Sequence, residues 1–485
     1  MFLAALAASV ATLQPAPCTV KDVPDGFEQK HKIECGWVSV PRDHRQPEGK
    51  TIRLWTARVR GTGSERHEDP VLYINGGPGI ATVDSMLPNL EQSKAMALLS
   101  EGRDLILFDQ RGSGRSEEAL CPALAEQLNT IASAGLAPEM QSEQSVAAFA
   151  SCKTSLDAAG VDLAAYSTRA TVHDIEAIRR AFGVERWNLA AISYGTLVAL
   201  DAMRTSPRAI RSVILNSPYP PNSASWAEQI SAVGGGFAAI DRECSLQADC
   251  RKRFGAIGSK LTETLARLES EPLVDGEKRI TGRQFMRALW PLAVRSATVK
   301  YVPLAIDRAH SGDEDLIRKI VAAYGGGDSF GGYSPAQSQA IMCPESGRTT
   351  DWFTRARVRY PAIAGGDPDD NWDRLCAAFR PGFVDPAFFA PVASDIPTLI
   401  YFGSFDPATP EIDAYQTARL LGRATLIEVT GASHGPMAVD DCTANIARTF
   451  LEAPDEKVDG SCLAARPPIE FATEGLDTLL APARN

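Results

Sequence analysis

Short apolar runs without polar interruption are the feature that most constrains the fold of this chain. They occupy positions 70–74, 104–108, 187–192, 210–215, 398–402 and 424–429. Helical patterns, such as those at 171–183 and 196–205, lie between some of them. A strand that is apolar on both faces is typical of a parallel sheet covered by helices on both sides. The sequence therefore predicts an α/β fold with a mostly parallel sheet and helices on both faces.

The strand signals stop in the middle of the chain and return later. Residues 36–60 are predicted to form a strand, a turn and a second strand. Predicted strands and helices then alternate to about residue 220. From 221 to about 390 the chain is mostly helical in pattern, with Gly-rich and polar loops. We therefore expect a first core part at 18–220, a helical cap insertion at 221–390 and a second core part at 391–485.

Two features of the sequence favour a secreted or periplasmic protein. Residues 1–17 begin with an apolar run of the length found in signal peptides, although no Lys or Arg precedes Lys21. This segment is predicted to be a signal peptide, with an N-terminal core helix as the alternative. The ten cysteines suit disulfides in an oxidising compartment, with ten buried free thiols as the alternative. If neighbours along the chain pair, the disulfides are expected to be Cys18–Cys35, Cys121–Cys152, Cys244–Cys250, Cys343–Cys376 and Cys442–Cys462, although the sequence leaves the connectivity open.

Composition and charge exclude several classes of partner. Asp and Glu number 60 against 49 Lys and Arg, so the formal net charge is −11. An acidic chain without a basic block repels phosphate, and we expect no nucleic-acid partner. No apolar run approaches the ~20 residues that span a bilayer. With no CxxC pair and only six His, we expect no metal site. Nothing in the sequence indicates an oligomeric state.

Ser193 is the candidate nucleophile. The segment Ala191-Ile192-Ser193-Tyr194-Gly195 lies between a predicted strand and a predicted helix. A sharp turn in this context lifts a Ser hydroxyl above the edge of the sheet, and small flanking residues relieve crowding. Ala191 stands where the usual pattern has Gly. By itself the segment is a weak signal, because a Ser hydroxyl needs a base to become a nucleophile.

Two loops downstream supply the partners that Ser193 requires. Asp406 follows the strand at 398–402, and His434 follows the strand at 424–429. Both loops lie at the carboxyl ends of strands, where open α/β sheets place their sites. His434 would take the proton from Ser193 and later give it to the leaving group, while Asp406 would orient and stabilise the imidazole. A turn residue and a solvated loop residue are the alternatives for Asp406 and His434.

Backbone N–H groups are needed to stabilise the oxyanion of the tetrahedral intermediate. Tyr194 directly follows the nucleophile, and Gly77 lies in the Gly-rich loop 76–79 after the first apolar strand. We expect their N–H groups to form the oxyanion hole. This loop lacks the Lys-Ser/Thr of a phosphate-binding loop, so we expect no cofactor. Arg111, beside glycines after the strand at 104–108, is expected to connect loops.

These motifs give the chain a family resemblance. Gly-Gly-Pro-Gly at 76–79, Asp-Gln-Arg-Gly-Ser-Gly at 109–114, Ser-Tyr-Gly at 193–195 and the Asp406 and His434 loops resemble α/β hydrolases of the proline iminopeptidase and tripeptidyl aminopeptidase family. The part from about 390 to 462 resembles the TAP-like C-terminal region. The resemblance implies an α/β-hydrolase fold and a serine exopeptidase that removes residues from peptide N-termini. The departures are Ala191 and Asn75, where proline iminopeptidases often carry His.

The resemblance also implies a carboxylate for the free α-ammonium group of the substrate. Cys343-Pro344-Glu345 looks like the Cys-x-Glu/Asp segment of the family, so Glu345 is the candidate, with a solvated Glu as the alternative. The partner would be a peptide or a small molecule. An esterase or amide hydrolase of a small hydrophobic metabolite remains open, because the fold does not determine the substrate. A non-catalytic binding protein is the third hypothesis, although it would need none of the three triad residues.

Overall fold

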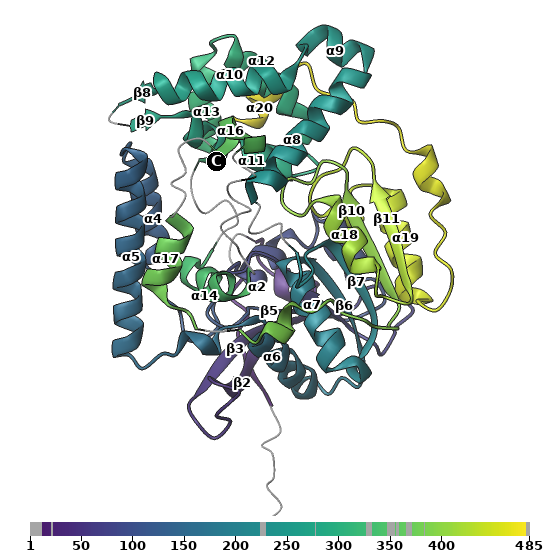
Figure 1. Cartoon of the computed structure of the whole chain (residues 1–485). Coiled ribbons are helices and arrows are strands. Elements are labelled where there is room, and N and C mark those ends of the chain that lie inside the picture. Colours follow the sequence, from purple (N-terminus) through teal and green to yellow (C-terminus); the bar gives the residue numbers. More distant parts are fainter. Residues whose placement is uncertain are drawn as a thin grey trace, which may run out of the picture.

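The structure is a computed structural model of the whole chain. It describes residues 12–20, 23–223, 229–276, 278–325, 332–346, 355, 358–364, 371–382 and 384–481. Residues 1–11 of the predicted signal peptide lie outside this part. Figure 1 shows a sheet with helices around it and a second, helical layer beyond one of its edges.

The main sheet has nine strands within the described residues, in the order β1-β2-β3-β5-β4-β6-β7-β10-β11. The strands are β1 (Leu13–Ala16), β2 (Ile33–Pro41), β3 (Thr51–Val59), β4 (Val71–Ile74), β5 (Leu105–Phe108), β6 (Trp187–Ser193), β7 (Ile210–Pro218), β10 (Thr398–Gly403) and β11 (Ala424–Val429). From β5 to β11 in this order the strands run parallel to one another, whereas β1, β2 and β3 form an antiparallel edge in which β3 pairs antiparallel with β5. The predicted α/β-hydrolase fold with its mostly parallel sheet is confirmed.

Helices cover both faces of the sheet, as the doubly buried strands require. One face packs on α6 (Thr168–Ala181), α7 (Tyr194–Thr205) and α18 (Glu411–Ala418), and the other on α3 (Lys94–Leu99) and α19 (Asp441–Glu452). β4, β5 and β10 are buried along their whole lengths. The continuous apolar runs in the sequence therefore match strands with packed side chains on both sides.

Within residues 221–390, helices and one small hairpin form the predicted helical layer (Figure 1). The helices are α8 (Gln229–Leu246), α9 (Ala248–Phe254), α10 (Ile257–Ser270), α11 (Gly282–Val294), α12 (Val302–His310), α13 (Glu314–Tyr324), α14 (Pro335–Glu345), α16 (Pro361–Ala364) and α17 (Asn371–Phe379). The hairpin pairs β8 (Leu273–Asp275) with β9 (Lys278–Ile280). Helices α8 to α13 share one hydrophobic core, which we call the cap core.

Two segments outside residues 221–390 also join this layer. Helices α4 (Leu124–Ser133) and α5 (Pro138–Ala158) lie beside α14 and α17 (Figure 1). From the C-terminal tail, α20 (Leu476–Leu479) packs Leu476 and Leu480 into the cap core. All three helices fall within the stretches that were expected to form the core, 18–220 and 391–485. The boundaries at 220 and 390 remain a prediction.

The cysteines are paired as their order along the chain suggested. The structure joins Cys18–Cys35, Cys121–Cys152, Cys244–Cys250, Cys343–Cys376 and Cys442–Cys462, with Cα–Cα distances of 5.0 to 5.9 Å. The first of these ties Cys18 to β2, next to the strand β1. β1 itself comes from the predicted signal segment, where Leu13–Ala16 pair antiparallel with residues 35–38. No described helix is long and apolar enough to cross a bilayer.

Candidate active site

Ser193 lies in a sharp turn between β6 and α7. Its φ of 55° and ψ of −130° are unusual for a residue other than Gly, as a strained nucleophile turn requires. Two glycines make room for it. A Cβ on Gly76 would lie 2.8 Å from the Ser193 Cβ, and a Cβ on Gly195 would overlap the backbone oxygen of Ile74. The predicted strand–turn–helix context of Ser193 is therefore present.

Ala191 replaces the usual Gly of the motif without disturbing this turn. Its side chain is buried at 2% exposure in the core on the α6 and α7 face of the sheet. It pairs with Leu215 of β7 and Ile74 of β4 in regular parallel register. One methyl group is thus accommodated within the packed sheet.

Asp406 and His434 meet at the carboxyl end of the sheet. Nδ1 of His434 lies 2.8 Å from Oδ2 of Asp406. Burial acts to raise the pKa of Asp406, but the adjacent His434 and hydrogen bonds from backbone N–H groups hold this pKa below its ordinary value. The carboxylate therefore stays ionised beside the imidazole. The Asp406 carboxylate is therefore placed to orient the imidazole ring of His434 so that Nε2 points away from Asp406.

Two hydroxyl groups that the sequence analysis did not identify hold Asp406 in place. Ser217 Oγ donates to Oδ2 at 2.8 Å, and Thr409 Oγ1 donates to the same oxygen at 2.9 Å. The N–H groups of Ala408 and Thr409 donate to Oδ1. Ser217 Oγ also accepts the N–H of Gly435, which follows His434. Ser217 lies near the carboxyl end of β7, at the same edge of the sheet as Ser193. This position at the end of a predicted strand is the sequence feature that could have identified Ser217 as part of the site.

Ser193 and His434 line one cavity of about 400 Å³. Gly77 and Tyr194 line it too, and Tyr194 opens α7, where first-turn N–H groups lack intrahelical partners. The contacts of the described residues include no hydrogen bond between Ser193 and His434. Such bonds are often long before substrate binds. The cavity therefore brings together four of the six residues that the sequence singled out for catalysis and binding, with Asp406 behind His434 and Glu345 outside.

Glu345 lies outside the described wall of the catalytic cavity. It ends α14, is 4% exposed, and is absent from the wall of the cavity as the described residues form it. Its carboxylate accepts the N–H of Thr168 at 2.8 Å and the Thr168 hydroxyl at 2.5 Å. Burial raises the pKa of Glu345 to about 7, although the bonds from Thr168 act in the opposite direction. The carboxylate of Glu345 therefore caps the start of α6 in this structure, and its role in binding an ammonium group stays a prediction.

Arg111 has the structural role that the sequence analysis assigned to it. It is fully buried, and its Nε donates to Asp174 at 2.7 Å. Its guanidinium also donates to the backbone oxygens of Arg42 and Ala165. The side chain thus connects the β2–β3 hairpin with the start of α6, away from the cavity of Ser193.

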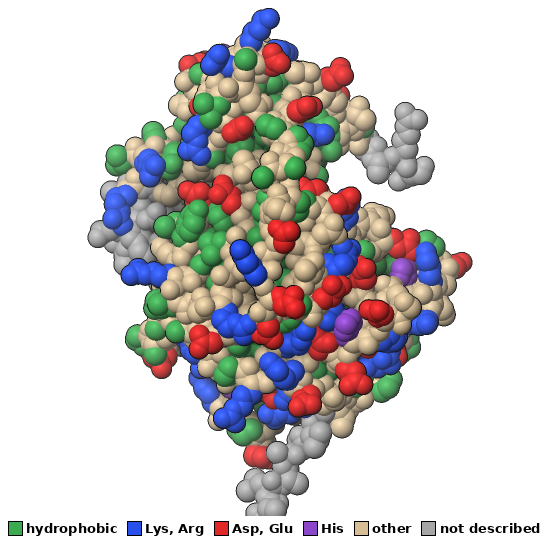
Figure 2. Space-filling view, turned by 90° about the vertical axis from the view of Figure 1, so that its right-hand side faces the viewer, with side chains coloured by type: hydrophobic (Ala, Val, Ile, Leu, Met, Phe, Trp, Pro, Cys, Tyr) green, Lys and Arg blue, Asp and Glu red, His purple; other side chains and the backbone are tan. Residues whose placement is uncertain are grey.

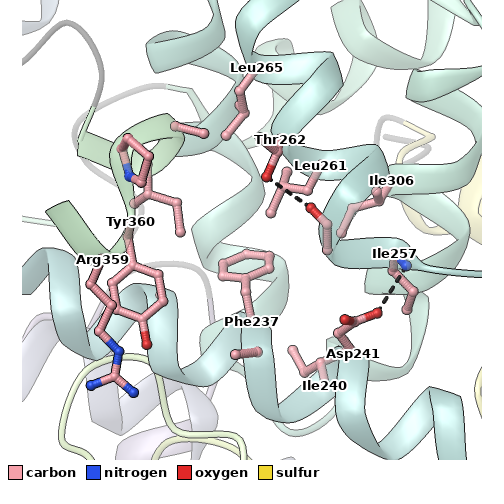
Figure 3. A pocket seen from close by; sticks show the side chains of 16 residues that line it. Phe237, Ile240, Asp241, Ile257, Leu261, Thr262, Leu265, Ile306, Arg359 and Tyr360 are labelled. Carbon is pink, nitrogen blue, oxygen red and sulfur yellow. Dashed lines mark hydrogen bonds between the residues drawn. The ribbon is translucent and has the colours of Figure 1, made fainter. Parts of the chain in front are cut away.

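A second cavity of about 210 Å³ lies inside the helical layer (Figure 3). Phe237, Leu261 and Ile306 make much of its wall, and Tyr360 covers one side. Its one carboxylate, Asp241, accepts the N–H of Ile257 at 2.9 Å. The described residues of this wall include no nucleophile with a neighbouring base, and Ser193 remains the candidate for catalysis. Among the described residues no three His, Cys, Asp or Glu side chains are grouped to hold a metal ion.

Comparisons with known families agree with this architecture. Residues 69–240 match the α/β hydrolase fold family, and residues 366–462 match the family described as TAP-like protein. The first match contains Ser193 and the Gly-rich loop, and the second contains Asp406 and His434. The chain is an α/β hydrolase with a TAP-like C-terminal region. The two matches are separated by most of the helical layer.

Several named proteins are similar to this chain in sequence. A tripeptidyl aminopeptidase of Streptomyces lividans is 28% identical over 39% of this chain and 36% of its own length. The serine protease Hip1 of Mycobacterium tuberculosis is 26% identical over 82% of this chain and 81% of its own length. A protein of the same species named carboxylesterase B is 27% identical over 82% and 80%. Because the match spans only about a third of the Streptomyces protein, that protein's activity is not carried over to this chain.

Proposed function

We propose that this protein is an exported serine hydrolase, and that it acts as an aminopeptidase on short peptides. The observation that carries this proposal is the convergence of Ser193, His434 and Asp406 at one end of the sheet. Peptidases among the relatives support a peptide substrate. The pairing of all ten cysteines supports a secreted or periplasmic location.

The mechanism follows from the positions of these side chains. His434 accepts the hydroxyl proton of Ser193 as Oγ attacks the carbonyl carbon, and Asp406 stabilises the imidazolium. The N–H groups of Gly77 and Tyr194 bind the oxyanion. His434 then protonates the leaving amine, which departs as the acyl-enzyme forms. Water, deprotonated by His434, hydrolyses the acyl-enzyme and restores the Ser193 hydroxyl.

An ester or blocked amide substrate is the second candidate, and one observation favours it. No Asp or Glu lines the catalytic cavity as the described residues form it. Tyr73, Ile80, Met86 and Trp290 make its wall largely apolar. An α-ammonium group would need a carboxylate there, whereas an apolar acyl group would not. The relative named carboxylesterase B agrees with this candidate.

A panel of matched substrates separates the candidates. Free aminoacyl p-nitroanilides, the same compounds with blocked amines, and p-nitrophenyl esters are assayed with the wild type, Ser193→Ala and the control Ser155→Ala on exposed α5. The aminopeptidase proposal expects cleavage of free amines, little cleavage of blocked ones, and loss with Ser193→Ala alone. Preference for blocked amides or esters would favour the second candidate. Activity that survives Ser193→Ala would overturn both.

A further inference from the structure

Helix α11 has two distinct faces. Phe285, Leu289 and Leu292 are fully buried in the cap core. Trp290 and Val294 lie on another face and line the catalytic cavity. The backbone oxygen of Val294 accepts the N–H of His434 at 3.1 Å, so the end of this helix touches the catalytic loop. Residues on the second face are therefore directed at the space above Ser193.

Arg287 belongs to this second face. It precedes Trp290 by three residues and Val294 by seven, and side chains at these spacings project from one side of a helix. Its side chain is exposed to solvent, yet surrounding protein lowers the pKa of Arg287, and the charge of Arg283 lowers it further. Tyr333, which lines the cavity, is near enough to oppose this effect. Arg287 is not part of the described cavity wall, so its place on this face and its nearness to Tyr333 fit a side chain at the rim of the cavity.

No carboxylate among the described residues offsets the charge of Arg287. It takes part in no ion pair or hydrogen bond with these residues, whereas the half-buried Arg308 and Arg318 of the same layer both pair with acidic side chains. Arg295, one residue beyond α11, lines the cavity and is a second cation on this side of it. A guanidinium that solvent reaches, and that has no counter-ion among the described residues, is available to form charge-assisted hydrogen bonds with a carboxylate of a ligand. Arg287 and Arg295 thus place positive charge beside the cavity in a protein whose net charge is −11.

We propose that Arg287 binds a carboxylate of the substrate, most simply the free C-terminal carboxylate of a short peptide on the leaving-group side. This inference rests on the proposed function. Seven residues of helix separate Arg287 from Val294, a rise of about 10 Å. An extended peptide covers roughly 3.3–3.6 Å per residue, and the Arg side chain shortens the gap. The carboxylate would therefore lie one to three residues beyond the scissile bond. An acidic side chain at this distance presents the same chemistry.

Matched peptides test the role of Arg287. Trialanine with a free carboxylate, its C-terminal amide, and an amide with Asp at the third position are compared in the wild type, Arg287→Gln and Arg287→Lys. Arg318→Gln on the outer surface is the charge control. We expect the wild type to prefer the free acid over the amide about tenfold or more in kcat/KM, mainly through KM. Arg287→Gln should abolish this ratio, Arg287→Lys should restore part of it, and Arg318→Gln should preserve it.

The outcomes distinguish this inference from the proposed function. Equal cleavage of acid and amide by the wild type, or a preference that survives Arg287→Gln, would overturn the inference. An Arg287-dependent preference for the Asp peptide would support carboxylate binding and identify a side chain as its source. If the protein hydrolyses no peptide, nitroanilide or ester, the proposed function fails. The inference is then decided by calorimetric binding of trialanine acid and amide to the Ser193→Ala protein with and without Arg287→Gln.

Discussion

The imidazole Nδ1 of His434 lies 2.8 Å from the carboxylate of Asp406, and the hydroxyl groups of Ser217 and Thr409 donate to that same carboxylate. The ring nitrogen that faces Asp406 therefore carries the proton, which leaves Nε2 as the basic atom. This arrangement links three loops at the carboxyl edge of the sheet. A substitution at Asp406 should therefore act through the tautomer of the His434 ring.

Asp406→Asn should reduce kcat by about 10³- to 10⁴-fold without unfolding the protein. An amide can donate to Nδ1 and so favours the wrong tautomer, while its size is unchanged. Steady-state kinetics measure the loss, and thermal unfolding of the variant reports on the fold. A variant within tenfold of wild-type kcat would show that Asp406 does not orient the base.

Gly76→Ala should lower kcat strongly while the fold persists. The added Cβ would stand 2.8 Å from the Ser193 Cβ and displace the nucleophile or the Gly-rich loop. Small displacements of reacting groups can cost about 10²-fold in rate. The comparison is Gly235→Ala in α8, where a Cβ meets nothing within 4 Å and helix propensity improves. Loss of activity in both variants to the same degree would contradict the steric explanation.

Glu345→Gln should change how stability depends on pH. Burial raises the pKa of Glu345 from an ordinary 4.5 to about 7, so the folded protein holds this proton where the unfolded chain has lost it. The contribution of Glu345 to the free energy of unfolding is therefore fully present below about pH 4.5 and is lost as the pH rises from about 4.5 to about 7. Above about pH 7 the free energy of unfolding stays lower by about 3 kcal/mol. Asp109, whose pKa burial also raises to about 7, acts in the same direction.

Urea unfolding at pH 5 and pH 8 checks this prediction. The neutral Gln cannot ionise, so the variant should lose less stability than the wild type between the two pH values. The exposed Glu452→Gln is the matched control and should leave the pH dependence unaltered. If Glu345→Gln shifts the free energy of unfolding equally at both pH values, ionisation of this side chain is not the cause.

Removal of the Cys343–Cys376 disulfide should lower the free energy of unfolding by about 3–4 kcal/mol, as chain entropy estimates for a closed loop of this length. The bond joins α14 to α17 across 33 positions and so holds part of the helical layer together. Denaturant unfolding of the Cys343→Ala/Cys376→Ala double variant measures the loss. A variant as stable as the wild type under oxidising conditions would refute this estimate.

The sheet and the triad candidates could be predicted because their signals are local. A strand buried on both faces must be apolar along its length, and a nucleophile turn needs small residues beside Ser193. Asp406 and His434 each follow such a strand, and parallel strands place their carboxyl ends at one edge. The even count and order of the cysteines likewise indicated the pairs that the structure contains.

The remaining features depend on contacts between distant segments. Nothing near Glu345 in the sequence shows that its carboxylate meets Thr168, 177 positions away, so an ammonium role looked equally reasonable. The same holds for Ser217 beside Asp406 and for α20 in the cap core. The sequence by itself determined the sheet, its nucleophile turn and the loops that follow its strands, because backbone geometry and burial act locally. Only the tertiary structure decided which side chains line the cavity, because that depends on how the helices pack above the sheet.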